Sequence, residues 1–405
     1  MDYQKSFSQH TRTMQSSLIR ELVASIKTVP DLISFAGGFP SPKTFPVKQL
    51  AALFSEIIQT EGADVLQYGA SEGDNLLKDE LIKWEGYSHL TYDNMLITAG
   101  ATNGIYYYTR CMIDEDDVIL CEAPTFLGTL VAFDAMGAKV HGIPMDDEGI
   151  DLDTLKKDLQ DLRAKGKKVK FLYTIPDFQN PTGITMSAQR RKDLIRFALD
   201  HDLPILEDNP YKRLRFTGED LPTLYRTAFE QFRNPDIVTE IASFSKILGP
   251  GMRLAFAKGD KNLIERMCSW QQKVNISPDC TTERAVARFL QKGLMKEHLK
   301  SICEFYKPYL ETMLEALERE MPSKVMWTRP EGGIFLWLWL PEKFNCDELF
   351  EQAREHKVAF IPGSKFFPIG EEQYNCMRLN FTYSTQEQIN EGITRLAELI
   401  KSLLA

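Results

Sequence analysis

The chain has 405 residues, of which 43% are hydrophobic and 26% are charged, and its net charge is −9. This composition excludes an intrinsically disordered chain, and the length suggests two or three domains, or one large core with an appendage. The acidic balance argues against a nucleic-acid-binding protein, because neutralising phosphates requires a basic surface. The longest purely apolar run, residues 334–340, is far shorter than the roughly 20 residues that cross a bilayer.

The cysteines and the N-terminus bear on metal binding and location. The seven cysteines are scattered without a CxxC pair, and the six histidines show no metal-ligand spacing. We therefore expect reduced thiols and no metal site. The first twelve residues contain no apolar segment typical of a signal peptide. These features predict a cytoplasmic protein that binds neither membranes nor nucleic acid.

From about residue 95 to residue 260, short strand-like runs alternate with amphipathic helices. The predicted strands are residues 95–98, 118–122, 139–143, 169–174, 203–207, 237–244 and 253–258, and the clearest helices end near residues 111, 136 and 201. This alternation predicts a largely parallel sheet covered by helices on both faces. Ligands of such sheets bind beyond the carboxyl ends of the strands, so polar residues at those ends are candidates for a site.

From about residue 280 the pattern changes. It predicts long helices at 281–297 and 301–320, strands at 333–340, 359–361 and 377–381, and a terminal helix. This is the pattern of a smaller α+β unit. We expect the first 45 or so residues to pack on it, because the Gly- and Pro-rich run 31–39 is too short to fold alone. The predicted organisation is an N-terminal segment (1–45), a large domain (46–285) and a small C-terminal domain (286–405).

The segment around Lys246 carries the strongest chemical signal. An apolar strand runs into Ser243 and Ser245, then Lys246, a Gly/Pro-rich turn and Arg253. A lysine at the end of a buried strand is costly unless it is paired or has a lowered pKa, and a neutral lysine is what imine formation with an aldehyde requires. Two hydroxyls and an arginine suit a phosphate. The alternative is a surface turn with a solvated lysine.

Other polar residues follow neighbouring strands. Asp208 comes directly after the run 203–207, and Tyr211 lies three residues further. A carboxylate there could hold a protonated ring nitrogen, whereas the alternative is an aspartate that caps a turn. Residues 100–104 (GATNG) open a helix, so their backbone N–H groups could bind an anion. This turn lacks the GxGxxG fingerprint or P-loop lysine of a nucleotide site.

Two more features complete the set. Residues 180–183 (NPTG) form a turn in which a cis proline is an option. Arg378 lies in a short apolar run, where an arginine usually faces a carboxylate of the protein or of a ligand. An aldehyde cofactor with a phosphate and a pyridine nitrogen accounts for all of these residues together. That cofactor is pyridoxal 5′-phosphate.

From about residue 17 to its end, the chain resembles the fold-type I pyridoxal phosphate-dependent aminotransferases of class I and II. It falls closest to the branch of 2-aminoadipate, kynurenine and broad-range aromatic aminotransferases. The motifs are SFAGGFPSPKTFP (34–46), LQYGASEG (66–73), TAGATNG (98–104), PDFQNPTG (176–183), EDNPY (207–211), SFSKILGPGMR (243–253), GGIFLWL (332–338) and MRLNF (377–381). The resemblance implies an α/β fold with a large PLP-binding domain, a smaller α+β domain, and a homodimer with shared active sites.

The resemblance also implies roles around the cofactor ring. Lys246 would bind the cofactor as an imine and later move the proton of the substrate. Asp208 would keep the pyridine nitrogen protonated, and Asn180 and Tyr211 would bind the 3′-oxygen. Phe126 would stack on the ring, although it lacks the hydroxyl of the tyrosine that is frequent at this position.

For the phosphate and the substrate, the resemblance implies contacts from several elements. The phosphate ligands would be the amides of Ala101 and Thr102, the side chains of Ser243, Ser245 and Arg253, and Tyr68 from the second subunit. The phosphate turn reads Ala-Thr-Asn where relatives often have Ser-Gln-Gln, so some side-chain contacts would be missing. Arg378 would bind the substrate α-carboxylate in bidentate fashion, helped by Asn180 and the backbone of Gly38.

Arg20 is a separate candidate. Residues 17–22 (SLIREL) match a mobile N-terminal helix of the 2-aminoadipate branch, on which an arginine can pair with an acidic substrate side chain. The alternative is an exposed arginine on an amphipathic helix, paired with a neighbouring glutamate.

These assignments predict a ping-pong Schiff-base transamination from an L-α-amino acid, aromatic, 2-aminoadipate-like or broad-range, to 2-oxoglutarate. Another PLP enzyme of the same fold, a carbon–sulfur lyase or a decarboxylase, is an open alternative because it would use the same lysine and aspartate. A non-catalytic PLP-binding transcription regulator would need a basic DNA-binding domain before the fold. Only about 30 residues precede the motif at 34–46, and the chain is acidic.

Overall fold

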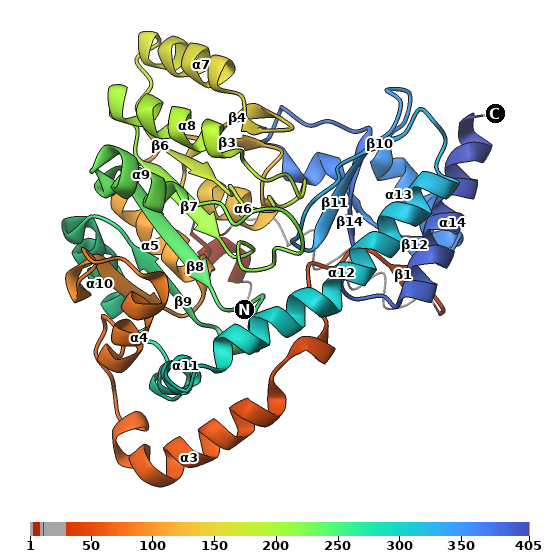
Figure 1. The fold of residues 1–405 in the computed structure, drawn as a ribbon. Coiled ribbons are helices and arrows are strands. Elements are labelled where there is room, and N and C mark those ends of the chain that lie inside the picture. Colours follow the sequence, from red (N-terminus) through yellow and green to blue (C-terminus); the bar gives the residue numbers. More distant parts are fainter. Residues whose placement is uncertain (1–2, 9–10, 12–29, 405) are drawn as a thin grey trace.

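The structure, a computed structural model, describes residues 3–8, 11 and 30–404 (Figure 1). Within this part, the α-helices are α3 (Val47–Val65), α4 (Asn75–Glu85), α5 (Ala101–Met112), α6 (Leu127–Ala135), α7 (Leu152–Ala164), α8 (Ala188–Asp200), α9 (Leu224–Phe232), α10 (Lys261–Val274), α11 (Cys280–Gln291), α12 (Leu294–Glu320), α13 (Cys346–Glu355) and α14 (Gln386–Leu404). The strands are β1 (Ile33–Ser34), β2 (Met95–Thr98), β3 (Val118–Ala123), β4 (Lys139–Asp146), β5 (Gly149–Ile150), β6 (Val169–Thr174), β7 (Ile205–Asn209), β8 (Val238–Ser243), β9 (Ala255–Lys258), β10 (Met326–Trp327), β11 (Phe335–Trp339), β12 (Val358–Ala359), β13 (Ile361–Pro362) and β14 (Cys376–Asn380).

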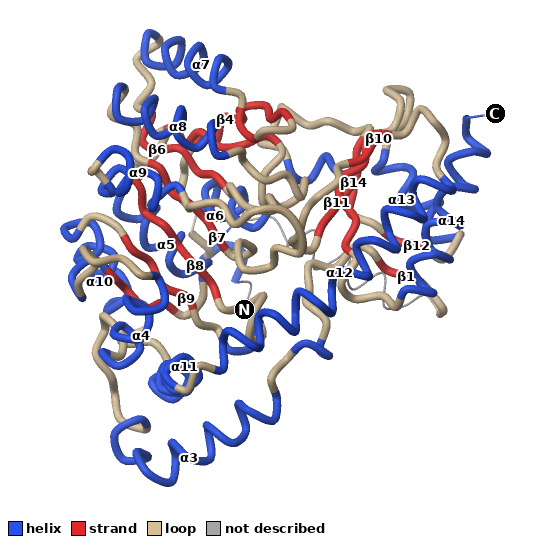
Figure 2. Tube along the Cα trace, viewed as in Figure 1, coloured by secondary structure: helices blue, strands red, loops and turns tan. Residues whose placement is uncertain are grey.

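The largest sheet among the described residues has eight strands in the order β2-β9-β8-β7-β6-β3-β4-β5. The five central strands, β8, β7, β6, β3 and β4, are parallel to one another, whereas β9, β2 and β5 pair antiparallel at the two edges. Figure 2 shows this sheet as one layer flanked by helices. The predicted α/β fold with a mainly parallel sheet is therefore confirmed. Its central strands are buried on both faces, as expected of strands that read as continuous apolar runs.

A second sheet, also within the described part, is antiparallel and has the order β10-β11-β14-β13. Helices α12 and α14 pack against each other beside it (Figure 1). The N-terminal residues from 30 onward join this unit. Strand β1 pairs with β12, the amide of Phe35 donates to the carbonyl of Ala359 at 2.8 Å, and the amide of Asn380 donates to the carbonyl of Phe35 at 2.8 Å. The domain boundaries at residues 46 and 286 stay a prediction.

Several element boundaries differ from the predicted ones. The predicted helix 281–297 is divided, because Gly293 adopts a left-handed conformation with φ +70° between α11 and α12. The break that we expected after residue 297 does not occur, and α12 continues through it. The predicted strand 359–361 is two short strands, β12 and β13, that belong to different sheets. Strand β7 extends to Asn209, so Asp208 lies inside the strand rather than after it.

The helices and side chains of the described part of the chain bear on membrane and metal binding. No helix there is long and apolar enough to cross a membrane. The same residues contain no group of three or more His, Cys, Asp or Glu side chains placed to hold a metal ion. All seven cysteines are free thiols.

Candidate active site

Four of the predicted site residues, Lys246, Asp208, Asn180 and Arg378, lie at one edge of the large sheet. Strands β6, β7 and β8 are adjacent and parallel, so their carboxyl ends meet at this edge. Asp208 belongs to β7, Asn180 lies in the loop after β6, and Lys246 follows the end of β8 at Ser243. Arg378 comes to the same edge from β14 of the second sheet and bonds to Asn180. The structure thus brings together residues that are far apart in the sequence.

Lys246 is held at this edge by the N-terminal part of the chain. Its Nζ donates a hydrogen bond to the carbonyl oxygen of Gly38 at 2.7 Å and lies 6.0 Å from the centre of the Tyr211 ring. Burial, and then the positive charges of Arg378 and Arg253, lower the pKa of Lys246 to about 8. A partly neutral amine can act as a nucleophile near neutral pH. The alternative of a solvated lysine on a surface turn is therefore wrong.

One carboxylate oxygen of Asp208 accepts a hydrogen bond, and the other has no partner among the described residues. The side chain is buried, and Oδ2 accepts a hydrogen bond from the hydroxyl of Tyr173 at 2.7 Å. Oδ1 is buried and has no hydrogen-bond partner among the described residues. Burial raises the pKa of Asp208 to about 6, and the Tyr173 hydrogen bond opposes this shift. A buried acceptor without a partner is costly, and a protonated ring nitrogen would satisfy it.

Asn180 connects Tyr211 with Arg378. The peptide bond between Asn180 and Pro181 is cis, the option that the sequence left open. The Asn180 amide nitrogen donates to the Tyr211 hydroxyl at 3.4 Å, and Arg378 Nη1 donates to its amide oxygen at 3.0 Å. Burial raises the pKa of Tyr211, so this phenol is a hydrogen-bond donor at neutral pH. The three side chains thus form one hydrogen-bonded group.

Arg378 is buried without a carboxylate. Its Nη2 donates to the carbonyl of Ala36 at 2.9 Å, and its guanidinium carbon lies 4.2 Å from the ring centre of Phe335 and 4.9 Å from that of Phe366. Burial lowers the pKa of Arg378 to about 10, which still leaves it charged at neutral pH. No acidic residue in the described part of the chain forms an ion pair with it. A buried cation in this state is suited to an anionic ligand.

The start of α5 forms an anion-binding turn. The helix begins at Ala101, so residues 101–104 of the predicted turn 100–104 form its first turn. The first N–H groups, those of Ala101 and Thr102, have no acceptor within the helix. Gly100 precedes it with φ +92°, and a Cβ atom added there would lie 2.4 Å from Nη2 of Arg253. The guanidinium of Arg253 thus packs directly against the backbone of this turn. A phosphate would meet both backbone donors and a positive charge here.

The remaining predicted residues have looser contacts. Ser243 Oγ donates to Ser245 Oγ at 3.0 Å and accepts from the Ser245 amide at 3.1 Å. Phe126 precedes α6 and is half-buried. Tyr68 is 77% exposed, so its ring is accessible to a second copy of the chain. Arg20 lies outside the described residues.

Sequence reasoning did not identify a buried network beside the site. Glu122, at the end of β3, accepts hydrogen bonds from the amide of Ile175 and from Gln179 Nε2, both at 3.1 Å. Gln179 Oε1 in turn accepts from the amide of Thr182 at 2.9 Å. This network fixes the loop that carries Asn180. Burial raises the pKa of Glu122 to about 7. In the sequence, the feature that could have indicated this network is the acidic residue at the end of the apolar run 118–121.

The arrangement fits the cofactor that the resemblance implies. Lys246 provides an amine with a lowered pKa, and Asp208 provides a buried acceptor without a partner. The N-terminus of α5 provides backbone donors for a phosphate. Arg378 supplies a fork of donors for a substrate carboxylate.

Comparisons with known proteins cover nearly the whole chain. The family model described as aminotransferase class I and II matches residues 31–396. The aromatic-amino-acid aminotransferase 1 of Thermococcus litoralis is 40% identical over 404 residues, which are 99% of this chain and 95% of that protein.

Two solved structures extend the likeness to three dimensions. The kynurenine aminotransferase of Pyrococcus horikoshii, in complex with PMP, superposes with a TM-score of 0.94 at 37% identity, covering 100% of this chain and 99% of that chain. The α-aminoadipate aminotransferase of Thermus thermophilus, complexed with N-(5′-phosphopyridoxyl)-L-leucine, has a TM-score of 0.90 at 33% identity, with the same coverage of 100% and 99%.

Proposed function

The chain belongs to the aminotransferase class I and II family, and we propose that it transfers the amino group of an L-α-amino acid to 2-oxoglutarate in a ping-pong reaction. It is a pyridoxal phosphate-dependent transaminase, so the predicted family, enzyme class and cofactor are confirmed. The observation that carries the proposal is the buried guanidinium of Arg378, which lacks a carboxylate and bonds to Asn180 at the edge that also carries Lys246.

We propose an aromatic or 2-aminoadipate-like amino acid as the donor, or a broad range that includes both. The support is that the similar proteins are an aromatic-amino-acid, a kynurenine and an α-aminoadipate aminotransferase. The rings of Phe335 and Phe366 beside Arg378 give the carboxylate site apolar walls. Arg20 remains the candidate for pairing with an acidic substrate side chain.

When bound, pyridoxal phosphate supplies an aldehyde carbon and an electron-withdrawing ring. Asp208 would hold the ring nitrogen through Oδ1, and Asn180 and Tyr211 would hold the oxygen next to the aldehyde. The amides at the start of α5 and Arg253 would hold the phosphate, together with Ser243 and Ser245. Phe126 would cover one face of the ring.

Lys246 is the residue that moves the proton in this proposal. With a pKa of about 8, its amine can accept a proton from the substrate Cα and return it at another position. The carbonyl of Gly38, 2.7 Å from Nζ, steadies the amine. Arg378 would bind the substrate carboxylate through two donors, which fixes the Cα–H bond relative to Lys246. The oxo acid would leave before 2-oxoglutarate binds, with the amino group retained in the site.

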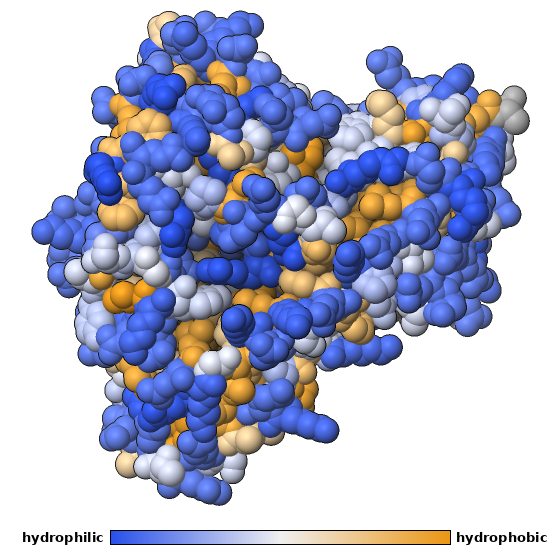
Figure 3. Space-filling view, viewed as in Figure 1, coloured by the Kyte–Doolittle hydropathy of each residue, from blue (hydrophilic) through white to orange (hydrophobic). Residues whose placement is uncertain are grey.

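We further propose a homodimer in which Tyr68 of each subunit reaches the phosphate in the other site. Large apolar side chains are exposed on neighbouring segments of the surface, with Leu66 at 71%, Val274 at 53% and Ile276 at 54%. Figure 3 shows apolar surface in the region of α3 and α11. A second subunit would cover these side chains.

The half-reaction distinguishes the proposal from its alternatives. The holoenzyme is mixed with single amino acids, and the absorbance change from the pyridoxal to the pyridoxamine form is recorded. Formation of one oxo acid per site, followed by return of the original spectrum on addition of 2-oxoglutarate, is the expected result. Release of carbon dioxide would instead indicate a decarboxylase, and release of sulfide or ammonia a lyase. Lys246→Ala serves as the inactive control.

A further inference from the structure

Tyr173 is a buried polar residue that the proposed mechanism does not yet use. It lies in β6, next to the strand of Asp208, and its side chain is fully buried. Its hydroxyl donates to Asp208 Oδ2 at 2.7 Å. A tyrosine has a single hydroxyl proton, so this proton is committed to the carboxylate.

Thr129 fixes the direction of that hydrogen bond. Thr129 lies in the first turn of α6 and is buried, and its Oγ1 donates to the Tyr173 oxygen at 3.0 Å. The Tyr173 oxygen therefore accepts from Thr129 and donates to Asp208, and both of its hydrogen-bonding functions are satisfied. The chain of donors runs in one direction, from the threonine to the carboxylate.

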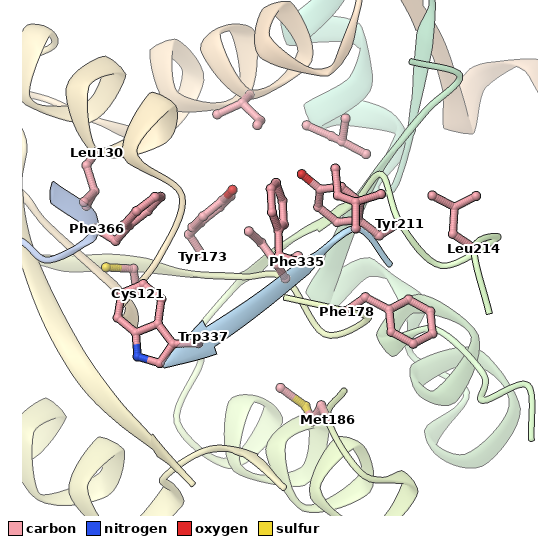
Figure 4. Close-up of a cluster of buried hydrophobic side chains, with 14 of the residues drawn as sticks. Cys121, Leu130, Tyr173, Phe178, Met186, Tyr211, Leu214, Phe335, Trp337 and Phe366 are labelled. Atoms are coloured by element: carbon pink, nitrogen blue, oxygen red, sulfur yellow. The ribbon is translucent and has the colours of Figure 1, made fainter. Parts of the chain in front are cut away.

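Packing leaves the Tyr173 ring little freedom to turn. The ring of Phe133 meets it edge-on, with the ring centres 5.5 Å apart. Figure 4 shows the phenol oxygens of Tyr173 and Tyr211 directed toward the same region, with the ring of Phe335 between them. The hydroxyl is thus held in place by the hydrophobic core and not only by its own hydrogen bonds.

The second oxygen of Asp208 explains why this orientation matters. Because Oδ2 is bound by Tyr173, the carboxylate cannot rotate freely, and Oδ1 is kept as the buried atom without a partner. Thr129 also lies in the same helical turn as Phe126, whose carbonyl accepts from the Thr129 amide at 3.0 Å. One helix start therefore connects the residue that would cover the cofactor ring with the residue that would hold its nitrogen.

We propose that Tyr173 is a positioning residue for the cofactor, whose hydroxyl fixes Asp208 so that Oδ1 faces the ring nitrogen, and that Thr129 holds Tyr173 in the donating orientation. This inference rests on the proposed role of Asp208. It adds two residues, one from β6 and one from α6, to the contacts on which binding of the ring depends.

The test compares holoenzymes of Tyr173→Phe and of the native protein. The phenylalanine keeps the ring packed and removes only the hydroxyl. The dissociation constant of pyridoxamine 5′-phosphate, measured by dilution of the holoenzyme, is expected to rise about tenfold, the effect of losing one hydrogen bond to a charged group. The visible circular dichroism of the bound cofactor, which reports a fixed ring orientation, is expected to fall.

Tyr108→Phe is the matched control. Tyr108 is also fully buried, contacts Phe171 of the same strand, and has a hydroxyl without a partner among the described residues. Its loss should leave the affinity and the dichroism unchanged. Thr129→Val should raise the dissociation constant and lower the dichroism as Tyr173→Phe does, but by less. Thr129→Ser should keep the native values of both, because serine keeps the hydroxyl donor.

A double variant separates positioning from general damage. In an Asp208→Asn background, Tyr173→Phe should weaken binding by less than about twofold, because the two residues act as a unit. An equal loss in both backgrounds, or native affinity and dichroism in Tyr173→Phe alone, overturns the inference. If Asp208→Asn itself binds the cofactor as the native protein does, the proposed role of Asp208 is wrong, which is a different result.

Discussion

Arg378 Nη1 donates a hydrogen bond to Oδ1 of Asn180 at 3.0 Å, and this bond joins the two sheets. Arg378 belongs to β14 of the small antiparallel sheet, and Asn180 to the loop that leaves β6 of the large one. The substrate-carboxylate site that we propose is therefore built from both parts of the molecule. Arg378 supplies the planar fork of donors, and the hydrogen bond to Asn180 orients that fork.

Replacing Arg378 with lysine tests this relationship. The lysine keeps the positive charge but loses the planar pair of donors, so KM for the amino acid should rise about tenfold or more, the effect of losing a charged hydrogen bond. Steady-state kinetics with saturating 2-oxoglutarate provide the measurement. Arg354→Lys is the control, because Arg354 pairs with the exposed Glu351 of the same helix, α13, and not with a site residue. An unchanged KM for every amino acid would show that Arg378 does not bind the substrate.

The lowered pKa of Lys246 predicts how the rate of cofactor binding depends on pH. Because the pKa of Lys246 is lowered to about 8, the amine is neutral above that pH and protonated below it. The rate at which the apoprotein captures pyridoxal phosphate should therefore rise about tenfold per pH unit up to pH 8 and then level off. Stopped-flow absorbance over pH 6–10 measures this rate.

Replacing Arg378 tests whether its charge contributes to the lowered pKa of Lys246. Arg378 is one of the positive charges that lower the pKa of Lys246. In Arg378→Met, loss of this charge favours the ammonium form, so the midpoint of the capture rate should move upward. If the capture rate of the native protein had its midpoint near pH 10.4, the ordinary pKa of lysine, the lowered pKa of Lys246 would be wrong.

The sequence predicted the strands and the charged site residues for a common reason. A charge in an apolar run is visible without a structure, and Lys246, Asp208 and Arg378 all stand at the ends of such runs or inside them. The limits of β2 and β6 agree with the prediction because turn residues or polar runs flank both. The break before α12 was misplaced, because helix propensity alone did not reveal which residue would adopt φ +70°.

Tyr173 and Thr129 could not be identified in the same way. In the run VKFLYT, a tyrosine is typical of a half-buried strand, and nothing in the sequence gives its partner. Its contact with Asp208 depends on the register of β6 and β7, in which Tyr173 lies opposite Leu206. Ala36 was missed for a similar reason, because it contributes only a backbone carbonyl to Arg378. Register and backbone contacts arise from the packed fold rather than from local patterns.

A buried ion group on β8 and β9 of the large sheet predicts a stability effect. Lys258 in β9 is fully buried, bonds to Glu85 at the end of α4, and lies 3.1 Å from Glu240. In Lys258→Met, Glu240 loses its cation and Glu85 keeps only Arg213, so the free energy of unfolding should fall by about 3–5 kcal/mol. Urea unfolding at pH 7 measures it. Lys292→Met, which breaks an exposed pair with Glu56, should cost less than about 1 kcal/mol.

The lowered pKa of Glu85 decides how the stability contributed by this ion group depends on pH. Burial alone would raise the pKa of Glu85, but the charges of Lys258 and Arg213 lower this pKa to about 2. The contribution to stability is thus present above the pKa of the unfolded chain, about 4.3, and is lost as the pH falls toward 2. The difference in stability between the native protein and Lys258→Met should shrink over this range. A difference that is independent of pH would show that the ion group is not its source.

The turn before α5 provides a test of phosphate binding that does not depend on catalysis. In Gly100→Ala, the added Cβ would lie 2.4 Å from Nη2 of Arg253, so the guanidinium must move away from the phosphate turn. Gly166→Ala is the matched control, because Gly166 also has a positive φ, +72°, but nothing lies within 4 Å of its Cβ position. Gly166→Ala should lose about 1 kcal/mol of stability from backbone strain. Gly100→Ala should lose more, about 1–3 kcal/mol, because φ +92° and ψ 160° lie in a region that is essentially restricted to glycine. Only Gly100→Ala should bind pyridoxamine 5′-phosphate more weakly while binding unphosphorylated pyridoxamine as the native protein does, and equal losses for both ligands would place the effect outside the phosphate site.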